Sequence, residues 1–216
     1  MSQPDLKILI GPKNRSTWSL RAWLLLAHYG IPFVEDRVDY NLPDGKARLN
    51  EISPSGWVPV IWHEGIMVWD TLAIAEYLAE AYPTYQMWPA DRAARARARS
   101  IVAEMHSGYA DMRNEMTMFF AESREGFTPS AACQANIDRI QTIFTTCREQ
   151  HGADGPFLFG RFSIADAFYA PVVSRFRTWG IGCEGAAAIY CETMWSLPSM
   201  QQWLTGAQAE LLEGEG

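Results

Sequence analysis

All runs of residues that can form β-strands lie in the first 70 residues, and their order limits the possible folds strongly. Residues 6–11 are a short apolar run that ends at Gly-Pro, which predicts a buried strand. A helical pattern follows, with Ser16 or Thr17 placed to cap its first turn. Residues 33–38 alternate weakly and predict a second strand, and residues 43–52 predict a short helix.

Two further apolar runs predict a β-hairpin. Residues 58–62 and 66–69 are joined by three residues that include a glycine, which is a typical hairpin link. Asp70 then precedes a strongly amphipathic helix over 71–82, whose apolar residues repeat at helical spacing. The predicted order of elements in this part of the chain is therefore βαβαββα.

The chain changes character after residue 90, where no strand pattern of any strength appears. Ser163 and Asp166 have the spacing of a capping box, which predicts a helix start with a structural role. Helices are predicted over 91–122, 129–150 and 163–178, with a last short helix from Pro198.

This change divides the chain into two predicted domains. The stretch between them contains two prolines and has the composition of a linker. We expect an α/β domain over 1–82, a linker over 83–90, and an all-helical domain over 91–216.

Composition excludes some classes of function. Apolar residues make up 48% of the chain, enough for a large core, so disorder is not expected. The net charge of −7 disfavours nucleic acid and anionic membranes as partners. We see neither a signal-peptide pattern nor an apolar run of the ~20 residues that a membrane span requires, and we expect a cytoplasmic protein.

The cysteines and histidines do not form a metal-binding pattern. There is no C-x-x-C and no H-x-x-x-H, and the cysteine spacings match no common zinc site. We expect no metal site and free thiols at all four cysteines, namely Cys133, Cys147, Cys183 and Cys191.

Four motifs, in order and suitably spaced, resemble the glutathione transferase superfamily over nearly the whole chain. Residues 15–21 (RSTWSLR) are similar to the R-S-S-C-S-W-R stretch of the zeta class, whose members include maleylacetoacetate isomerases. Residues 53–60 (SPSGWVPV), 68–74 (VWDTLAI) and 160–166 (GRFSIAD) resemble the other superfamily motifs. The resemblance implies a thioredoxin-like N-terminal domain (βαβαββα), an all-α C-terminal helical bundle, glutathione as co-substrate, and a homodimer.

The first motif implies a serine that activates the glutathione thiol. A thiol has a pKa of ~8.5, so a hydroxyl donor beside a helix N-terminus is needed to favour the reactive thiolate at neutral pH. The resemblance places Ser16 on the activating serine, Thr17 on the serine that follows it, and Trp18 on the cysteine of the family motif. The alternative is that Ser16 or Thr17 only caps the helix.

The second and third motifs imply the glutathione-binding residues. Val58 precedes Pro59 in a bond that we expect to be cis, and Val58 is expected to pair with the glutathione backbone. Trp57 stands where relatives often carry a Lys or Gln that holds the glycyl carboxylate, so that anchor is not identified. Asp70 and Thr71, at a helix N-terminus, are suited to the ammonium and carboxylate of the γ-glutamyl group. A plain helix cap is the simpler alternative for this pair.

The second substrate is expected between the domains, against the helix 91–122. Candidate contacts are Met105, His106, Tyr109 and Arg113, which lie at helical spacing. A stripe of this kind can equally belong to the helical core.

Three classes of function are compatible with these motifs to different degrees. The leading prediction is a glutathione transferase that acts on a small electrophile, with a zeta-type maleylacetoacetate isomerase as the alternative. A glutathione-dependent disulfide reductase is disfavoured, because no cysteine occurs before Cys133. A non-catalytic binding or interaction domain remains the third possibility.

Overall fold

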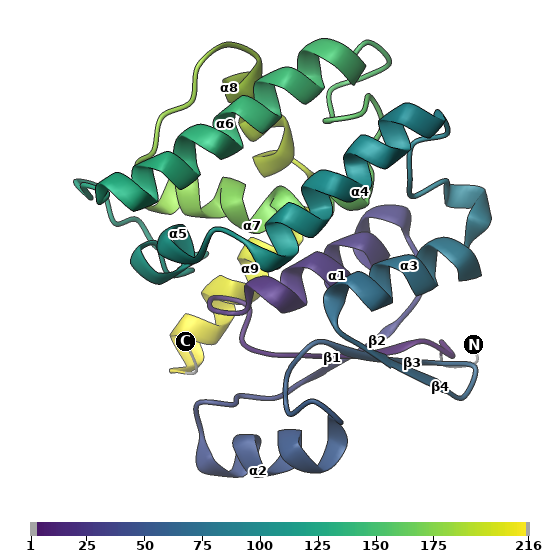
Figure 1. Ribbon diagram of the computed structural model, residues 1–216. Helices are drawn as coiled ribbons and strands as arrows, with labels where there is room; N and C mark the ends of the chain where they lie inside the picture. The colour runs from purple at the N-terminus through teal and green to yellow at the C-terminus, as the bar shows by residue number, and fades with distance from the viewer. Residues whose placement is uncertain (1–3, 215–216) are drawn as a thin grey trace.

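The computed structural model describes residues 4–214, and its N-terminal part contains a four-stranded sheet in the order β2-β1-β3-β4 (Figure 1). β1 pairs parallel with β2 and antiparallel with β3, and β3 pairs antiparallel with β4. The strands are β1 (Lys7–Ile10), β2 (Val34–Arg37), β3 (Val60–His63) and β4 (Ile66–Trp69).

Three helices complete this domain in the predicted order, βαβαββα. α1 (Thr17–Tyr29) and α3 (Thr71–Ala81) pack against one face of the sheet, and α2 (Pro43–Ile52) lies on the other (Figure 1). Gly30 ends α1 in the left-handed conformation with φ of 65°, where glycine avoids the steric cost of a side chain. The predicted thioredoxin-like arrangement is confirmed.

The rest of the described chain is helical. α7 packs against both α1 and α4, so one apolar core continues from the sheet domain into the helical domain (Figure 1). None of the helices in residues 4–214 combines the length and apolarity needed to cross a bilayer. They are α4 (Arg92–Ser107), α5 (Ala110–Glu115), α6 (Ala131–His151), α7 (Ile164–Thr178), α8 (Gly185–Trp195) and α9 (Pro198–Glu213).

The prediction of one continuous helix over 91–122 is wrong. α4 ends at Gly108, and Tyr109 adopts the left-handed conformation with φ of 63° before the short α5 begins. The chain leaves helical geometry again at Met116. The Ala- and Arg-rich start of this stretch has strong helix propensity, whereas the single glycine in its middle carried the signal for the break.

Two other helical features also differ from the prediction. α8 was not predicted, because its apolar residues are spread around the helix instead of forming one stripe. α9 has 16 residues and is not short. Within 83–90, Pro83–Tyr85 form a 3₁₀ turn, while Met87 and Trp88 are buried, so this stretch packs against the protein.

The predicted capping box at the start of α7 is confirmed. Asp166 Oδ2 accepts hydrogen bonds from Ser163 N at 2.8 Å and from Ser163 Oγ at 2.9 Å. Asp166 Oδ1 also accepts one from Leu158 N at 3.1 Å, so this carboxyl joins α7 to the turn that precedes it.

Candidate active site

The loop between β1 and α1 places Ser16 at the start of α1. Pro12 O accepts hydrogen bonds from Arg15 N at 3.1 Å and Ser16 N at 2.8 Å, so the chain turns immediately before the helix. Ser16 then acts as the N-cap, with its Oγ accepting from Ser19 N at 3.3 Å and donating to Ser19 Oγ at 2.8 Å. Ser16 is only 4% exposed, and its hydroxyl proton is engaged by Ser19.

The hydroxyls beside Ser16 differ in their environments. Ser19 Oγ accepts a hydrogen bond from Gly11 N at 3.0 Å and so links α1 to the end of β1. Thr17 is also buried, but its hydroxyl makes no hydrogen bond to the residues that the structure describes. Ser16 and Thr17 therefore carry adjacent hydroxyl groups. That of Ser16 is hydrogen-bonded to Ser19, and that of Thr17 makes no hydrogen bond to the described residues.

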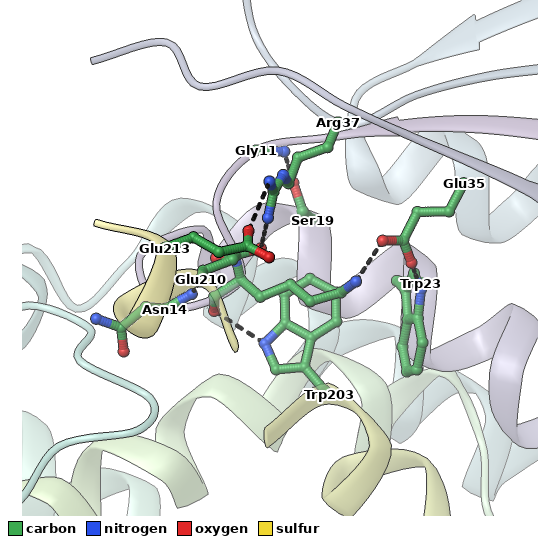
Figure 2. Close-up of polar contacts among 10 residues, drawn as sticks. Gly11, Asn14, Ser19, Trp23, Glu35, Arg37, Trp203, Glu210 and Glu213 are labelled. Carbon is green, nitrogen blue, oxygen red and sulfur yellow. Dashed lines mark hydrogen bonds and ion pairs between the residues drawn. The ribbon is translucent and has the colours of Figure 1, made fainter. Parts of the chain in front are cut away.

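The last helix of the described chain holds this loop in place (Figure 2). Glu210 in α9 is buried, and its Oε2 accepts hydrogen bonds from Lys13 N at 2.6 Å and Asn14 N at 3.3 Å. Its Oε1 forms an ion pair with Arg37 at 2.9 Å. Trp203 Nε1 donates to Lys13 O at 2.9 Å. The position of Ser16 thus depends on contacts between the two domains.

The bond between Val58 and Pro59 is cis, as predicted. It lies just before β3, in the central part of the sheet. Both residues line a cleft of about 490 Å³. Its walls are formed by Trp18, Ser55, Trp57, Val58, Pro59, Trp69, Asp70 and Thr71.

Asp70 and Thr71 stand at the N-terminus of α3, and both line this cleft. Asp70 has φ of 70°, and its Oδ1 accepts a hydrogen bond from Leu72 N at 2.8 Å. Its other carboxylate oxygen lies 3.4 Å from His106 Nε2. Thr71 is 2% exposed, and its Oγ1 is buried without a hydrogen-bond partner. An unpaired buried hydroxyl is costly, so this atom is suited to a ligand.

At another side of the cleft, Trp57 is 70% exposed. Lys46 Nζ lies 4.9 Å from the centre of the Trp57 ring and donates to Gly56 O at 3.3 Å. A cation from α2 therefore lies beside Trp57, which occupies the position where relatives often carry a lysine or glutamine.

Two arginines and a histidine surround Trp18, the cleft residue in α1. The guanidinium carbon of Arg21 lies 4.3 Å from the Trp18 ring centre, that of Arg113 lies 5.1 Å away, and the His106 ring is 5.3 Å away. Arg21 is fully buried, and none of its guanidinium nitrogens has a hydrogen-bond partner. Burial lowers the pKa of Arg21 well below its usual value, and the charges of Arg113 and Arg175 lower it further. Burial also lowers the pKa of His106.

The predicted substrate stripe separates into two groups. His106 and Arg113 contact Trp18 in the cleft wall. Met105 is completely buried in the core, and Tyr109 Oη donates to Glu104 Oε1 at 2.6 Å. The break at Gly108 moves Tyr109 away from the position that the predicted continuous helix gives it.

One group among the described residues could offer three metal-ligand atoms, namely Asp5, His63 and Glu64. Both ring nitrogens of His63 are already hydrogen-bonded, Nδ1 to Tyr77 Oη at 2.9 Å and Nε2 to Tyr82 Oη at 3.0 Å. The histidine is therefore held by tyrosines, and we assign no metal role to this group.

Comparison with known proteins identifies the family. The family model for the glutathione S-transferase N-terminal domain matches residues 15–81, and that for the C-terminal domain matches residues 130–190. A probable maleylacetoacetate isomerase from Caenorhabditis elegans is 30% identical over 161 residues, which cover 74% of each chain. The maleylacetoacetate isomerase of Rattus norvegicus is 34% identical over 169 residues, again 74% of each chain. The chain belongs to the glutathione transferase superfamily.

Solved structures of glutathione transferases support this assignment. A glutathione transferase homologue from Burkholderia gl BGR1, determined with bound glutathione, superimposes with a TM-score of 0.70 at 25% identity. The match covers 94% of this chain and 98% of that one. Glutathione is the co-substrate of this superfamily, whose zeta class includes maleylacetoacetate isomerases.

Several residues at or near this candidate site were not found from the sequence. Glu210 lies far along the chain from Ser16, although a glutamate at helical spacing from Trp203 and Ala207 was a signal that it faces the core. Lys46 was overlooked because it lies in the polar helix α2. Arg21 was treated as an alignment marker only, and no sequence pattern indicates that its charge is buried without a hydrogen-bond partner among residues 4–214.

Proposed function

We propose that this protein binds glutathione in the cleft and activates its thiol with Ser16 for attack on a small electrophile. The observation that carries the proposal is the buried, unpartnered Thr71 Oγ1 at the N-terminus of α3, in the wall of an open cleft. A donor of this kind beside free backbone N–H groups is suited to a carboxylate.

The γ-glutamyl end of glutathione has both charges that this corner can accept. Its carboxylate would bind the Thr71 hydroxyl and the first N–H groups of α3, and its ammonium would bind the Asp70 carboxylate. Asp70 is suited to this role because Leu72 N occupies one carboxylate oxygen and leaves the other near His106 at the cleft. The backbone of Val58 would pair with the cysteinyl residue.

Lys46 is our candidate for the glycyl carboxylate. It lies beside Trp57, and among residues 4–214 its ammonium is held by a 3.3 Å hydrogen bond to Gly56 O and by the exposed indole ring. A lysine stem can reorient toward a carboxylate at small cost, because both contacts are at the surface. Lys46 would thus take the role of the lysine or glutamine that relatives often carry at the position of Trp57.

Ser16 would favour the thiolate through a charge-assisted hydrogen bond near the positive end of the α1 dipole. Its hydroxyl proton now points to Ser19 Oγ, which also receives the Gly11 N–H. Rotation of the Ser16 hydroxyl from Ser19 toward sulfur would leave Ser19 bonded to Gly11. Thr17 is the rival donor, because its hydroxyl has no such bond to exchange.

The second candidate function is maleylacetoacetate isomerisation, in which glutathione adds to a double bond, permits rotation, and leaves again. The positive groups around Trp18 favour it, because a dicarboxylic substrate would be attracted to Arg113 and to the buried charge of Arg21. In that reaction Arg113 would hold a carboxylate, the buried Arg21 would attract the substrate through its charge without touching it, and Ser16 would hold the thiolate.

The homodimer typical of the superfamily is also our expectation for this chain. β4 forms an edge of the sheet, and its side chains Ile66 and Met67 are exposed. An exposed apolar edge strand is commonly covered by a partner. Light scattering coupled to gel filtration measures the mass directly.

One set of assays separates the candidates. The purified protein is passed over immobilised glutathione, then assayed with an aryl halide and with maleylacetoacetate. Retention with aryl halide conjugation supports the transferase, and rapid isomerisation with weak conjugation supports the isomerase. Retention without either reaction supports the non-catalytic alternative, and absence of retention contradicts glutathione binding in the cleft.

A further inference from the structure

Two cysteines meet near α8, in a part of the molecule that the proposed active site does not use. Cys183 lies in the irregular segment before α8, and Cys191 lies within the helix. Their sulfur atoms are 3.7 Å apart, close enough for one thiol to donate to the other. The two cysteines are eight residues apart in the sequence, and α8 begins between them.

Both thiols are accessible to a small reagent. Each cysteine is half-buried, and both line a cavity of about 200 Å³ between α7 and α8. Arg177 and Glu192 also line this cavity, so it contains one basic and one acidic side chain. The hydrogen bond from Cys191 lowers the pKa of Cys183, while Cys191 itself has its pKa raised.

The other two cysteines provide an internal contrast. Cys133 and Cys147 are buried on α6, each without a second thiol beside it. Burial raises the pKa of each to about 11. Because the thiolate is the reactive form, these two thiols should be inert under conditions in which Cys183 reacts.

A disulfide requires the two sulfurs to move closer together, and Cys183 lies in a segment without helix or strand structure. The sulfurs must approach from 3.7 Å to about 2 Å, the length of an S–S bond. Cys183 lies outside α7 and α8, between Gly182 and Glu184, and a Cβ added at Gly182 would meet no atom within 4 Å. The described residues place no third His, Asp or Glu ligand at this pair. The two cysteines are therefore better suited to forming a disulfide with each other than to binding zinc.

We propose that Cys183 and Cys191 are a redox-active dithiol that glutathione disulfide converts to an intramolecular disulfide. The Cys183 thiolate attacks one sulfur of glutathione disulfide, which breaks that S–S bond and releases one glutathione thiolate. Cys191 transfers its proton to this thiolate and attacks Cys183 Sγ, which releases the second glutathione. The protein loses two electrons and forms one S–S bond, and glutathione disulfide is reduced to two molecules of glutathione.

The test uses the full chain equilibrated in buffers that range from reduced glutathione to glutathione disulfide. Samples are quenched in acid, alkylated with N-ethylmaleimide after unfolding, and digested with trypsin. No Lys or Arg follows Arg177, so residues 178–216 form one peptide that contains both cysteines. We expect this peptide to carry two alkyl groups in reduced buffers, and to be lighter by two hydrogens and unalkylated in oxidising buffers.

Single variants test the order of the steps. Cys191→Ser removes the second thiol, so glutathione should remain attached to Cys183, whereas the matched variant Cys147→Ser should oxidise like the wild type. In the folded reduced protein, Cys183 should react with N-ethylmaleimide at least tenfold faster than Cys147, since one pKa unit changes the thiolate fraction about tenfold. The proposal is overturned if the peptide stays doubly alkylated throughout the buffer series, or if Cys191→Ser acquires no glutathione.

Discussion

Glu210 Oε2 in the last helix lies 2.6 Å from the backbone nitrogen of Lys13, in the loop that leads to Ser16. The same carboxylate accepts from Asn14 N and pairs with Arg37 at the end of β2, so one buried side chain joins three segments (Figure 2). The geometry of the proposed thiol site therefore depends on α9.

Replacement of Glu210 should destabilise the protein and disturb this loop. Glu210→Ala leaves the Lys13 and Asn14 N–H groups without their acceptor, and each unpaired buried donor costs roughly 1–3 kcal/mol. Urea unfolding should therefore show a loss of about 2–4 kcal/mol. The control is Glu213→Ala, because Glu213 is exposed and reaches only Arg37 at 3.8 Å. Equal stabilities of the two variants would contradict the role assigned to Glu210.

Thr71→Val should weaken glutathione binding with little effect on the fold. The change removes the hydroxyl that has no partner in the free protein and keeps the shape of the side chain. We expect a loss of ~1–3 kcal/mol in binding free energy, measured by calorimetry, because the bound carboxylate then lacks one donor. Unchanged affinity would place the γ-glutamyl group elsewhere.

Lys46→Ala should raise the dissociation constant of glutathione by about three- to tenfold, which corresponds to the ~1 kcal/mol expected of an exposed ion pair. Lys46→Arg keeps the charge and should restore most of the affinity. The specific check is γ-glutamylcysteine, which lacks the glycyl carboxylate. Its affinity should be the same for the wild type and Lys46→Ala, and an equal loss for both ligands would exclude Lys46 as the glycyl anchor.

Stability should depend on the ionisation of Asp166 in the capping box. Burial raises the pKa of Asp166 from 3.8 to about 6, despite hydrogen bonds from Leu158 and Ser163. Because the folded pKa lies above the unfolded one, this contribution to stability is fully present below pH 3.8 and is lost as pH rises through about 6. The loss is on the order of 3 kcal/mol.

Asp166→Asn is the matched control for that dependence, since it keeps the shape of the side chain and cannot ionise. The difference in unfolding free energy between wild type and variant, measured in urea from pH 4 to pH 8, should become less favourable to the wild type as pH rises. A difference that is constant across this range would show that Asp166 remains ionised.

Local structure was predicted well from the sequence where it depends on a single residue or on the spacing of apolar residues. The cap at Asp70, the hairpin of β3 and β4, and the capping box at Ser163 depend on neighbouring residues, and all are confirmed. The break at Gly108 was missed because strong helix formers precede it and the left-handed Tyr109 has no local sequence signal. The contact of Glu210 with Lys13 joins residues 197 apart, so no local pattern can reveal it.

In the candidate site, too, residues in local sequence motifs were predicted, whereas residues placed by long-range packing were not. The cleft residues Val58, Pro59, Asp70 and Thr71 come from motifs and do line one cleft. His106 and Arg113 contact Trp18 in its wall. Met105 is buried in the core within α4, and the position of Tyr109 depends on how α4 ends. The buried charge of Arg21 follows from the packing of α1 against α7, which the sequence of α1 alone does not contain.

The last prediction is that Ser16, and not Thr17 or Ser19, lowers the thiol pKa of bound glutathione. A hydroxyl-to-thiolate hydrogen bond is worth roughly 1.5–3 kcal/mol, and one pKa unit is ~1.4 kcal/mol. Ser16→Ala should therefore raise the pKa of the bound thiol by about one to two units and reduce turnover at pH 7 roughly tenfold. Glutathione affinity should fall much less, because the contacts at Val58 and Thr71 remain.

The measurement is kcat/KM against pH for Ser16→Ala, Thr17→Val and Ser19→Ala. Ser19→Ala removes the acceptor that now holds the Ser16 proton, so Ser16 becomes free to donate to sulfur and the thiol pKa should not rise. It also leaves Gly11 N without its partner, so its effect should appear in stability instead. A raised thiol pKa in Thr17→Val alone would assign activation to the unbonded hydroxyl of Thr17. If none of the three variants moves the thiol pKa, the backbone N–H groups at the start of α1 must stabilise the thiolate.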